Sequence, residues 1–216
     1  MVHTVKRVHD EILVIDNIVP EHLQHQIIDR VQGDKHFPWF LLHRLGHAGH
    51  FGKGVSPNYV DQNITDDVAL THMAFDGEHQ SVHYDFFKSI LDFLTEKTDI
   101  EVGQLLRIRL RYTHPVPGHT AEKYSAPHVD FFTSQPYSTL VYYIDDCDGD
   151  TIIFDKVFNP QEEEYNPVIA EPLTELLRLT PKRGTGLFFN GHRYHAGNYP
   201  IERSTRIVIN FDFVTK

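Results

Sequence analysis

The stretch Arg206-Ile-Val-Ile-Asn-Phe-Asp-Phe213 alternates along its length with the period of a β-strand. One face carries four apolar side chains, Ile207, Ile209, Phe211 and Phe213. The other face carries Arg206, Val208 and Asn210. We expect the apolar face to pack on helices, which turns Arg206 toward the interior of a β-structure. An inward arginine needs an anionic partner, because burying an unpaired charge is very costly.

The second half of the chain predicts several more strands and no helix. We expect strands at 105–113, 139–144, 151–154, 176–179, 187–190 and 206–214. Turn residues separate them at 115–118, 148–150 and 181–184. Short strands without intervening helices are typical of an antiparallel sandwich or barrel.

The first half predicts a strand and two helices around a long loop. Residues 12–16 form a short apolar run, and a helical pattern then runs from Pro20 to Gly33. A second amphipathic helix is predicted at 81–98. Residues 35–63 are rich in aromatic residues and glycine, which predicts a long loop of the kind that often has a function. We therefore expect one domain over residues 1–216. Residues 1–98 form its helical support and aromatic loop, and residues 99–216 form a β-barrel core.

Composition excludes several classes of protein. Asp and Glu outnumber Lys and Arg by 30 to 20, which argues against a nucleic-acid partner. The single cysteine, Cys147, cannot form an internal disulfide, so the sequence suits a reducing, cytoplasmic compartment. No export signal is visible, and no stretch approaches the ~20 apolar residues of a membrane span. Because the chain has a single cysteine, any metal site must use histidine and carboxylate ligands.

Only a few of the 16 histidines are placed to bind one metal ion together with a second ligand. His128-Val-Asp130 is a plausible pair, because residues two apart on a strand point to the same face. The triplet His83-Tyr-Asp85 lies in the predicted helix, where residues two apart diverge, and we reject it as a ligand pair. A third ligand is needed. His195 is the best candidate and His192 is its alternative.

The combination of His128-x-Asp130, His195 and Arg206 resembles the signature of iron(II)- and 2-oxoglutarate-dependent dioxygenases, specifically the prolyl-hydroxylase-like branch and its phage-borne relatives. The gap from His195 to Arg206 is eleven residues, slightly longer than in many relatives, and Arg203 at eight residues is the alternative. The segments 139–144, 149–154 and 181–189 are similar to strands of this family, and the match is looser at 37–40 and 71–75.

The resemblance implies a mainly β fold with flanking α-helices. This is a double-stranded β-helix, a jelly-roll or cupin-like barrel with the N-terminal helices packed on one outer face. It also implies iron(II) held by His128, Asp130 and His195, which leaves three coordination positions open for 2-oxoglutarate and dioxygen. Arg206 would bind the far carboxylate of 2-oxoglutarate as a bidentate cation. Further contacts to the co-substrate are implied for Tyr143, Tyr112 and Thr139, and ascorbate is a further cofactor of the family.

The function implied is a hydroxylase of prolyl residues in a peptide or protein, with no nucleic-acid or membrane partner. It would act in the cytoplasm, that of the host cell if the gene is phage-borne. One alternative is the same core acting on a free amino acid or another small molecule. A second is a non-catalytic, cupin-like module that binds a metal or ligand. The acidic net charge favours neutral or basic peptides over acidic ones.

Overall fold

The computed structural model describes residues 3–42, 69–125, 127–161, 173–203 and 205–216. Its elements are, in chain order, β1 (Thr4–His9), β2 (Ile12–Asp16), α1 (Glu21–Ile28), β3 (Phe40–Leu42), β4 (Ala69–Phe75), α2 (Tyr84–Lys97), β5 (Val102–Thr113), β6 (Ser138–Tyr143), β7 (Thr151–Val157), β8 (Glu175–Leu179), β9 (Gly186–Asn190), β10 (Arg193–Gly197) and β11 (Arg206–Thr215). A π-helical turn at Asp29–Gly33 extends α1. The predicted helices and strands are confirmed with ends shifted by a few residues. Strands β1, β3, β4 and β10 were not among those expected.

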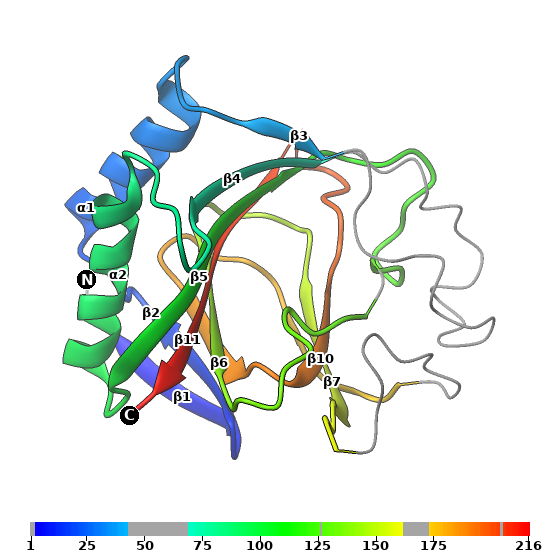
Figure 1. Ribbon diagram of the computed structural model, residues 1–216. Helices are drawn as coiled ribbons and strands as arrows, with labels where there is room; N and C mark the ends of the chain where they lie inside the picture. The colour runs from blue at the N-terminus through cyan, green and yellow to red at the C-terminus, as the bar shows by residue number, and fades with distance from the viewer. Residues whose placement is uncertain (1–2, 43–68, 126, 162–172, 204) are drawn as a thin grey trace.

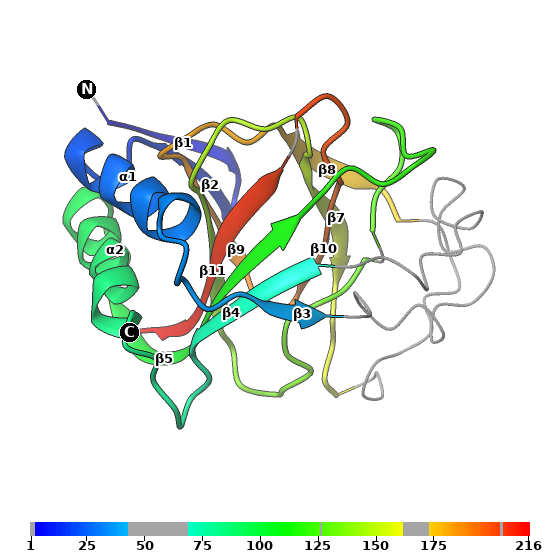
Figure 2. The ribbon, with the colours of Figure 1, turned by 90° about the horizontal axis from the view of Figure 1, so that it is seen from above.

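The strands form two antiparallel sheets that face each other (Figures 1 and 2). The larger sheet has the order β1-β2-β9-β6-β11-β5-β4-β3, and the smaller has the order β10-β7-β8. The chain leaves the larger sheet after β6, returns to it at β9, leaves again for β10 and returns at β11. This repeated crossing between two facing sheets is a double-stranded β-helix, so the expected fold class is confirmed.

Both helices cover the outer face of the larger sheet (Figure 2). On α2, the buried side chains of Phe87, Ile90 and Leu94 belong to the same core cluster as Ile209 and Phe211 of β11. The apolar face of β11 therefore packs under the helices as expected. Since successive residues of a strand alternate between faces, Arg206, Val208 and Asn210 point between the two sheets.

The smaller sheet buries apolar side chains on both of its faces. Ile153 of β7 points inward and packs with Val141, Leu187 and Val208 between the sheets. The alternating residues point outward and form a second cluster with Val129, which includes Ile152, Phe154, Tyr194 and Ala196. The polar residues of β5 and β11 that remain between the sheets make up the candidate site.

The predicted loop at 35–63 is described only up to Leu42. Phe37 is buried in the main core against Phe87, with ring centroids 6.2 Å apart. The Trp39 indole donates a hydrogen bond to the carbonyl of Val31 at 3.1 Å, which anchors this segment to the π-helical turn that follows α1. Residues 43–63 lie outside the described part of the chain. Neither described helix has the length and apolar character needed to cross a bilayer.

Candidate active site

His128 and Asp130 reach the space between the sheets from a short extended segment. His128 forms a single β-bridge with His195, in which each backbone N–H donates to the other residue's carbonyl at 2.9 Å. Val129, between the two, is buried in the outer cluster of the smaller sheet. His128 and Asp130 therefore point inward together. The period-two argument holds here, although the segment makes one bridge rather than a full strand.

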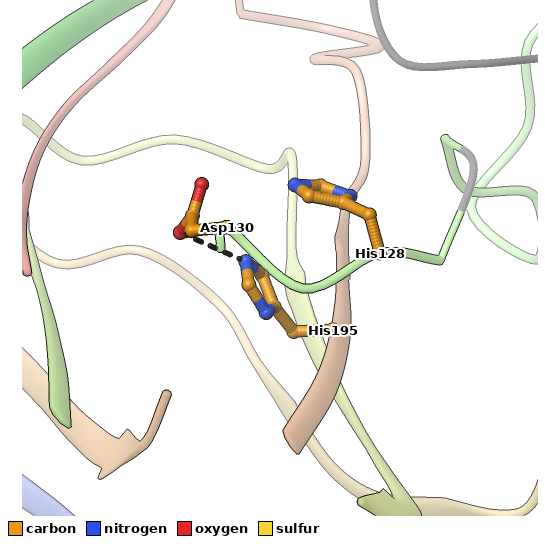
Figure 3. Close-up of side chains that lie close together, drawn as sticks. All are labelled: His128, Asp130 and His195. Carbon is orange, nitrogen blue, oxygen red and sulfur yellow. Dashed lines mark ion pairs between the residues drawn. The ribbon is translucent and has the colours of Figure 1, made fainter. Parts of the chain in front are cut away.

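His195 comes from β10, whose neighbouring residues Tyr194 and Ala196 point to the outer cluster. Its imidazole therefore faces inward, toward the side chains of His128 and Asp130 (Figure 3). One potential ligand atom from each of the three residues lies within 4.8 Å of the other two. His195 Nε2 lies 3.5 Å from Asp130 Oδ2.

The three side chains fit a metal ion. His195 Nδ1 lies 3.2 Å from the carbonyl of Arg193 and can donate to it, which leaves the Nε2 lone pair for a metal. Asp130 Oδ2 is buried and has no hydrogen-bond partner among the described residues. A metal would satisfy this oxygen. Two imidazoles and one carboxylate, with further positions open, are the donor set of non-haem iron(II) sites.

A buried charge network holds the other oxygen of Asp130. Arg107 forms ion pairs with both Asp130 and Asp212, and Arg109 Nη2 lies 3.2 Å from Asp130 Oδ1. Burial raises the pKa of the Asp130 carboxyl, but Arg107, His195 and Arg109 together hold it well below its usual range. Asp130 is therefore a carboxylate near neutral pH, as a metal ligand must be.

Thr139 lies at the far end of this network. Its hydroxyl donates a hydrogen bond to Asp212 Oδ1 at 2.8 Å, and Asp212 Oδ2 accepts from Arg107 Nε at 2.9 Å. Burial raises the pKa of Asp212 to about 6. Thr139, expected to contact 2-oxoglutarate, is thus connected to Asp130 through Asp212 and Arg107. Thr139 thus helps to hold Asp212 and Arg107 in place, and Arg107 in turn holds the carboxylate of Asp130.

Arg107, Arg109 and Arg111 alternate with apolar residues along β5, but they do not lie on a solvated face of the strand. The intervening residues Ile108 and Leu110 are fully buried under the helices, so the arginines point between the two sheets. The smaller sheet covers that face, and Arg107 is only 8% exposed. Polar residues alternating with apolar ones predict a two-faced strand. They do not tell which face a second sheet will cover.

Arg206 is buried and lines one pocket with His128 and His195. Its Nε donates to the carbonyl of Gly149 at 2.7 Å, and its Nη2 donates to Thr151 Oγ1 at 2.8 Å. A side chain at Gly149 would place Cβ 2.8 Å from Arg206 Cδ, so the glycine permits this approach. Thr151 was not among the expected site residues. Its place in the Gly149–Phe154 strand, similar to a family motif, was the signal that could have identified it.

The two tyrosines predicted near the co-substrate lie on different faces of the large sheet. Tyr143 is fully buried beside Arg206 and Thr151, and burial raises the pKa of its hydroxyl to about 12. Tyr112 lies on the helix-facing side of β5, where its ring packs against Trp39 at 5.4 Å. The structure therefore places Tyr143 between the sheets, next to two residues that line the pocket, and places Tyr112 on the opposite face of the sheet.

The alternatives to His195 and Arg206 lie elsewhere. The His192 ring packs between Tyr137 and Phe158, at centroid distances of 5.0 and 5.9 Å. Arg203 is exposed in the bend before β11, where its backbone N–H donates to Asp148 Oδ1 at 3.4 Å. Neither joins the cluster of His128, Asp130 and His195.

Comparison with known proteins shows which solved structures have a similar fold. Neither a family model nor a curated protein sequence matches the chain. Among solved structures it is similar to the non-haem alpha ketoglutarate (2-oxoglutarate) dependent epimerase SnoN from nogalamycin biosynthesis, with a TM-score of 0.57 and 11% identity over 95% of this chain and 78% of that chain. A SnoN structure also exists in complex with Fe3+, alpha ketoglutarate and nogalamycin RO.

Two prolyl hydroxylases share the fold. A Pseudomonas putida prolyl-4-hydroxylase matches with a TM-score of 0.51 and 10% identity, over 95% of this chain and 93% of that chain. A Trichoplax adhaerens prolyl hydroxylase, in complex with a hypoxia inducible factor peptide fragment, matches with a TM-score of 0.55 and 12% identity, over 95% and 84%. At these identities the comparisons establish the double-stranded β-helix of 2-oxoglutarate-dependent enzymes as the fold of this chain.

Proposed function

We propose that this protein is an iron(II)- and 2-oxoglutarate-dependent oxygenase that hydroxylates its substrate. The observation that carries the proposal is one pocket in which His128 and His195, beside Asp130, face the buried cation Arg206. A non-catalytic cupin-like module needs no buried guanidinium directed into the same pocket as an open metal site. Iron(II) and 2-oxoglutarate, when bound, supply the oxidation of a substrate C–H bond to C–OH, coupled to conversion of 2-oxoglutarate and dioxygen to succinate and carbon dioxide.

The residues of the chain bind and orient the reacting groups. His128, Asp130 and His195 hold the metal, and Arg107 fixes the Asp130 carboxylate. Arg206 and Thr151 hold the far carboxylate of 2-oxoglutarate, because a guanidinium can donate two parallel hydrogen bonds to it. The β-sheets around the pocket exclude water from the reaction.

For the substrate we propose a prolyl residue in a peptide or protein. Support comes from the resemblance of the site residues to prolyl hydroxylases and from the shared fold of two such enzymes. A second candidate is a small molecule. SnoN is an enzyme of nogalamycin biosynthesis, and so is the carbocyclase SnoK, which has a TM-score of 0.60 and 9% identity over 94% of this chain and 79% of that chain.

The test measures succinate formed from 2-oxoglutarate in the presence of iron(II), dioxygen and ascorbate. Proline-rich peptides and free amino acids are compared for stimulation of succinate release and for the gain of one oxygen atom by mass spectrometry. Stimulation by peptides supports the prolyl assignment, and stimulation by free amino acids alone replaces it with the small-molecule candidate. Absence of iron-dependent 2-oxoglutarate binding and turnover would refute the proposed function itself.

A further inference from the structure

The arginines in and beside the pocket carry more positive charge than the described carboxylates paired with them neutralise. Three guanidiniums project from alternate residues of β5, at positions 107, 109 and 111, and Arg206 projects beside them from β11. The ion pairs that the described residues make with these four cations involve two carboxylates, Asp130 and Asp212. An excess of two positive charges remains. Iron(II) and the 2-oxoglutarate dianion would cancel each other and leave that excess in place.

Arg111 is the cation of this set that lacks a partner. Within the described part of the chain it forms no ion pair and no side-chain hydrogen bond, and its Nε is buried without an acceptor. It is half-buried, so its guanidinium can be reached from the pocket, which it lines together with His128, His195 and Arg206. A buried guanidinium nitrogen without an acceptor is costly, which an incoming anion would relieve.

Arg111 makes a smaller contribution to the pKa values of the neighbouring cations. Arg107 and burial together lower the pKa of Arg109 to about 10, with Arg111 adding to the effect. Burial lowers the pKa of Arg206, again with a contribution from Arg111. Arg107 is committed to the two aspartates, and Arg206 is the proposed anchor of 2-oxoglutarate. Arg111 is therefore the guanidinium available for another anion.

We propose that the primary substrate presents a carboxylate to Arg111, close to the carbon that is hydroxylated. The inference rests on the proposed oxygenase function and adds the chemical class of the substrate. A planar guanidinium fork matches a carboxylate in a bidentate geometry. Because Arg111 shares its pocket with two metal ligands, the carboxylate lies near the reacting carbon. It can be the α-carboxylate of a free amino acid or C-terminal residue, or an acidic side chain next to the target. The acidic net charge of the whole chain favours a neutral or basic substrate. The positive charge at the pocket instead favours a substrate that carries a carboxylate.

The experiment measures binding in the anaerobic complex of the protein with iron(II) and 2-oxoglutarate, in which no turnover occurs. The readout is the change that each ligand causes in the visible charge-transfer band. Each acid is paired with its amide: proline with prolinamide, N-acetylproline with N-acetylprolinamide, and acetyl-Pro-Asp-amide with acetyl-Pro-Asn-amide. Benzoate and benzamide serve as a pair without a prolyl group. The pair that responds identifies the source of the carboxylate.

We expect the acid of at least one pair to bind about tenfold or more tightly than its amide. Arg111→Gln should remove that preference while changing the dissociation constant of 2-oxoglutarate by less than about twofold, and Arg111→Lys should restore only part of it. Arg203→Gln, in an exposed bend, is the matched control and should retain the preference.

Three outcomes would overturn the inference. In the first, no acid binds more tightly than its amide. In the second, the Arg111→Gln variant keeps the preference. In the third, this variant instead weakens 2-oxoglutarate binding, which would make Arg111 a ligand of the co-substrate. Failure of the wild-type protein to form the charge-transfer band at all would refute the proposed oxygenase function, and so is distinguishable from these results.

Discussion

His192 and His195 stand three residues apart, but only His195 faces the other candidate ligands. We expect His195→Ala to weaken iron(II) binding by more than about tenfold. Mutation of a residue that only hydrogen-bonds to a metal ligand already lowers metal affinity by about that factor, and His195 is a proposed ligand itself. His192→Ala should leave iron binding unchanged. Calorimetric titration of anaerobic iron(II) into both variants is the measurement. Normal affinity in the His195 variant, with loss in the His192 variant, would reverse the assignment.

Arg206 and Arg203 are also three residues apart, and only Arg206 lines the pocket. Arg206 is buried and donates to Thr151, while Arg203 is exposed before β11. We expect Arg206→Lys to weaken 2-oxoglutarate binding by about tenfold or more and to leave iron binding nearly intact, because lysine keeps the charge but loses the bidentate pair. Arg203→Lys should behave as the wild type. Titration of 2-oxoglutarate, followed by the charge-transfer absorbance of the anaerobic complexes, decides between them.

Strand β5 supplies the buried cation Arg107 that separates two buried carboxylates. We expect Arg107→Met to reduce the free energy of unfolding by about 3–5 kcal/mol, because Asp212 would lose the cation paired with it and Asp130 would keep only Arg109. Arg109→Met is the matched control, since Arg109 is partly exposed and, among the described residues, pairs with Asp130 and not with Asp212. Urea denaturation of the metal-free proteins gives the two values. An equal or smaller loss in the Arg107 variant would contradict this account.

His72 joins β4 to the segments on either side of it. Its Nδ1 lies 3.0 Å from the carbonyl of Pro38, and its Nε2 lies 3.0 Å from Ser81 Oγ. Burial lowers the pKa of His72 below 6.5, partly opposed by the bond to Pro38, while His83 lowers it further. The folded protein therefore binds a proton at His72 less readily than the unfolded chain does.

The sign of this shift predicts acid sensitivity. Above pH 6.5 the imidazole is neutral in both states, and its contribution to stability is complete. As the pH falls below 6.5, the unfolded chain gains the proton first, so His72 reduces the free energy of unfolding by up to about 1.4 kcal/mol per pH unit. His72→Asn, which can still donate to Pro38, should show a shallower loss between pH 7 and 5. The free energy of unfolding of both proteins is measured by urea denaturation across this pH range. An equal loss per pH unit in the wild type and the variant would refute the role of His72.

At the scale of the whole molecule, the metal and co-substrate would cross-link segments far apart in the sequence. Their ligands come from the segment around His128, from β10 and from β11. We expect iron(II) and 2-oxoglutarate, each at about 100 times its dissociation constant, to stabilise the folded state by at least about 2.7 kcal/mol. Anaerobic thermal denaturation should therefore show a midpoint raised by several degrees, which a chelator reverses. A similar increase in His195→Ala would place the bound metal elsewhere.

The sequence by itself predicted both helices and strands β2, β5 to β9 and β11, and it named the three residues that the structure brings together as a candidate metal site. The alternation in β11 was enough to predict which of its residues pack under the helices and that Arg206 points inward, because a strand has only two faces. The His128-x-Asp130 spacing predicted a shared direction for the same reason. These are local rules, and they need no knowledge of what covers either face.

Only the tertiary structure decided what stands opposite each face. β5 has the same alternation as β11, but whether its arginines meet water or a second sheet depends on where the chain crosses between the sheets. For the same reason, the sequence did not tell that Tyr112 faces the helices or that Thr139 donates a hydrogen bond to Asp212. Contacts between residues over a hundred positions apart, such as Arg107 with Asp212, depend on the packing of two sheets. No local pattern encodes that packing.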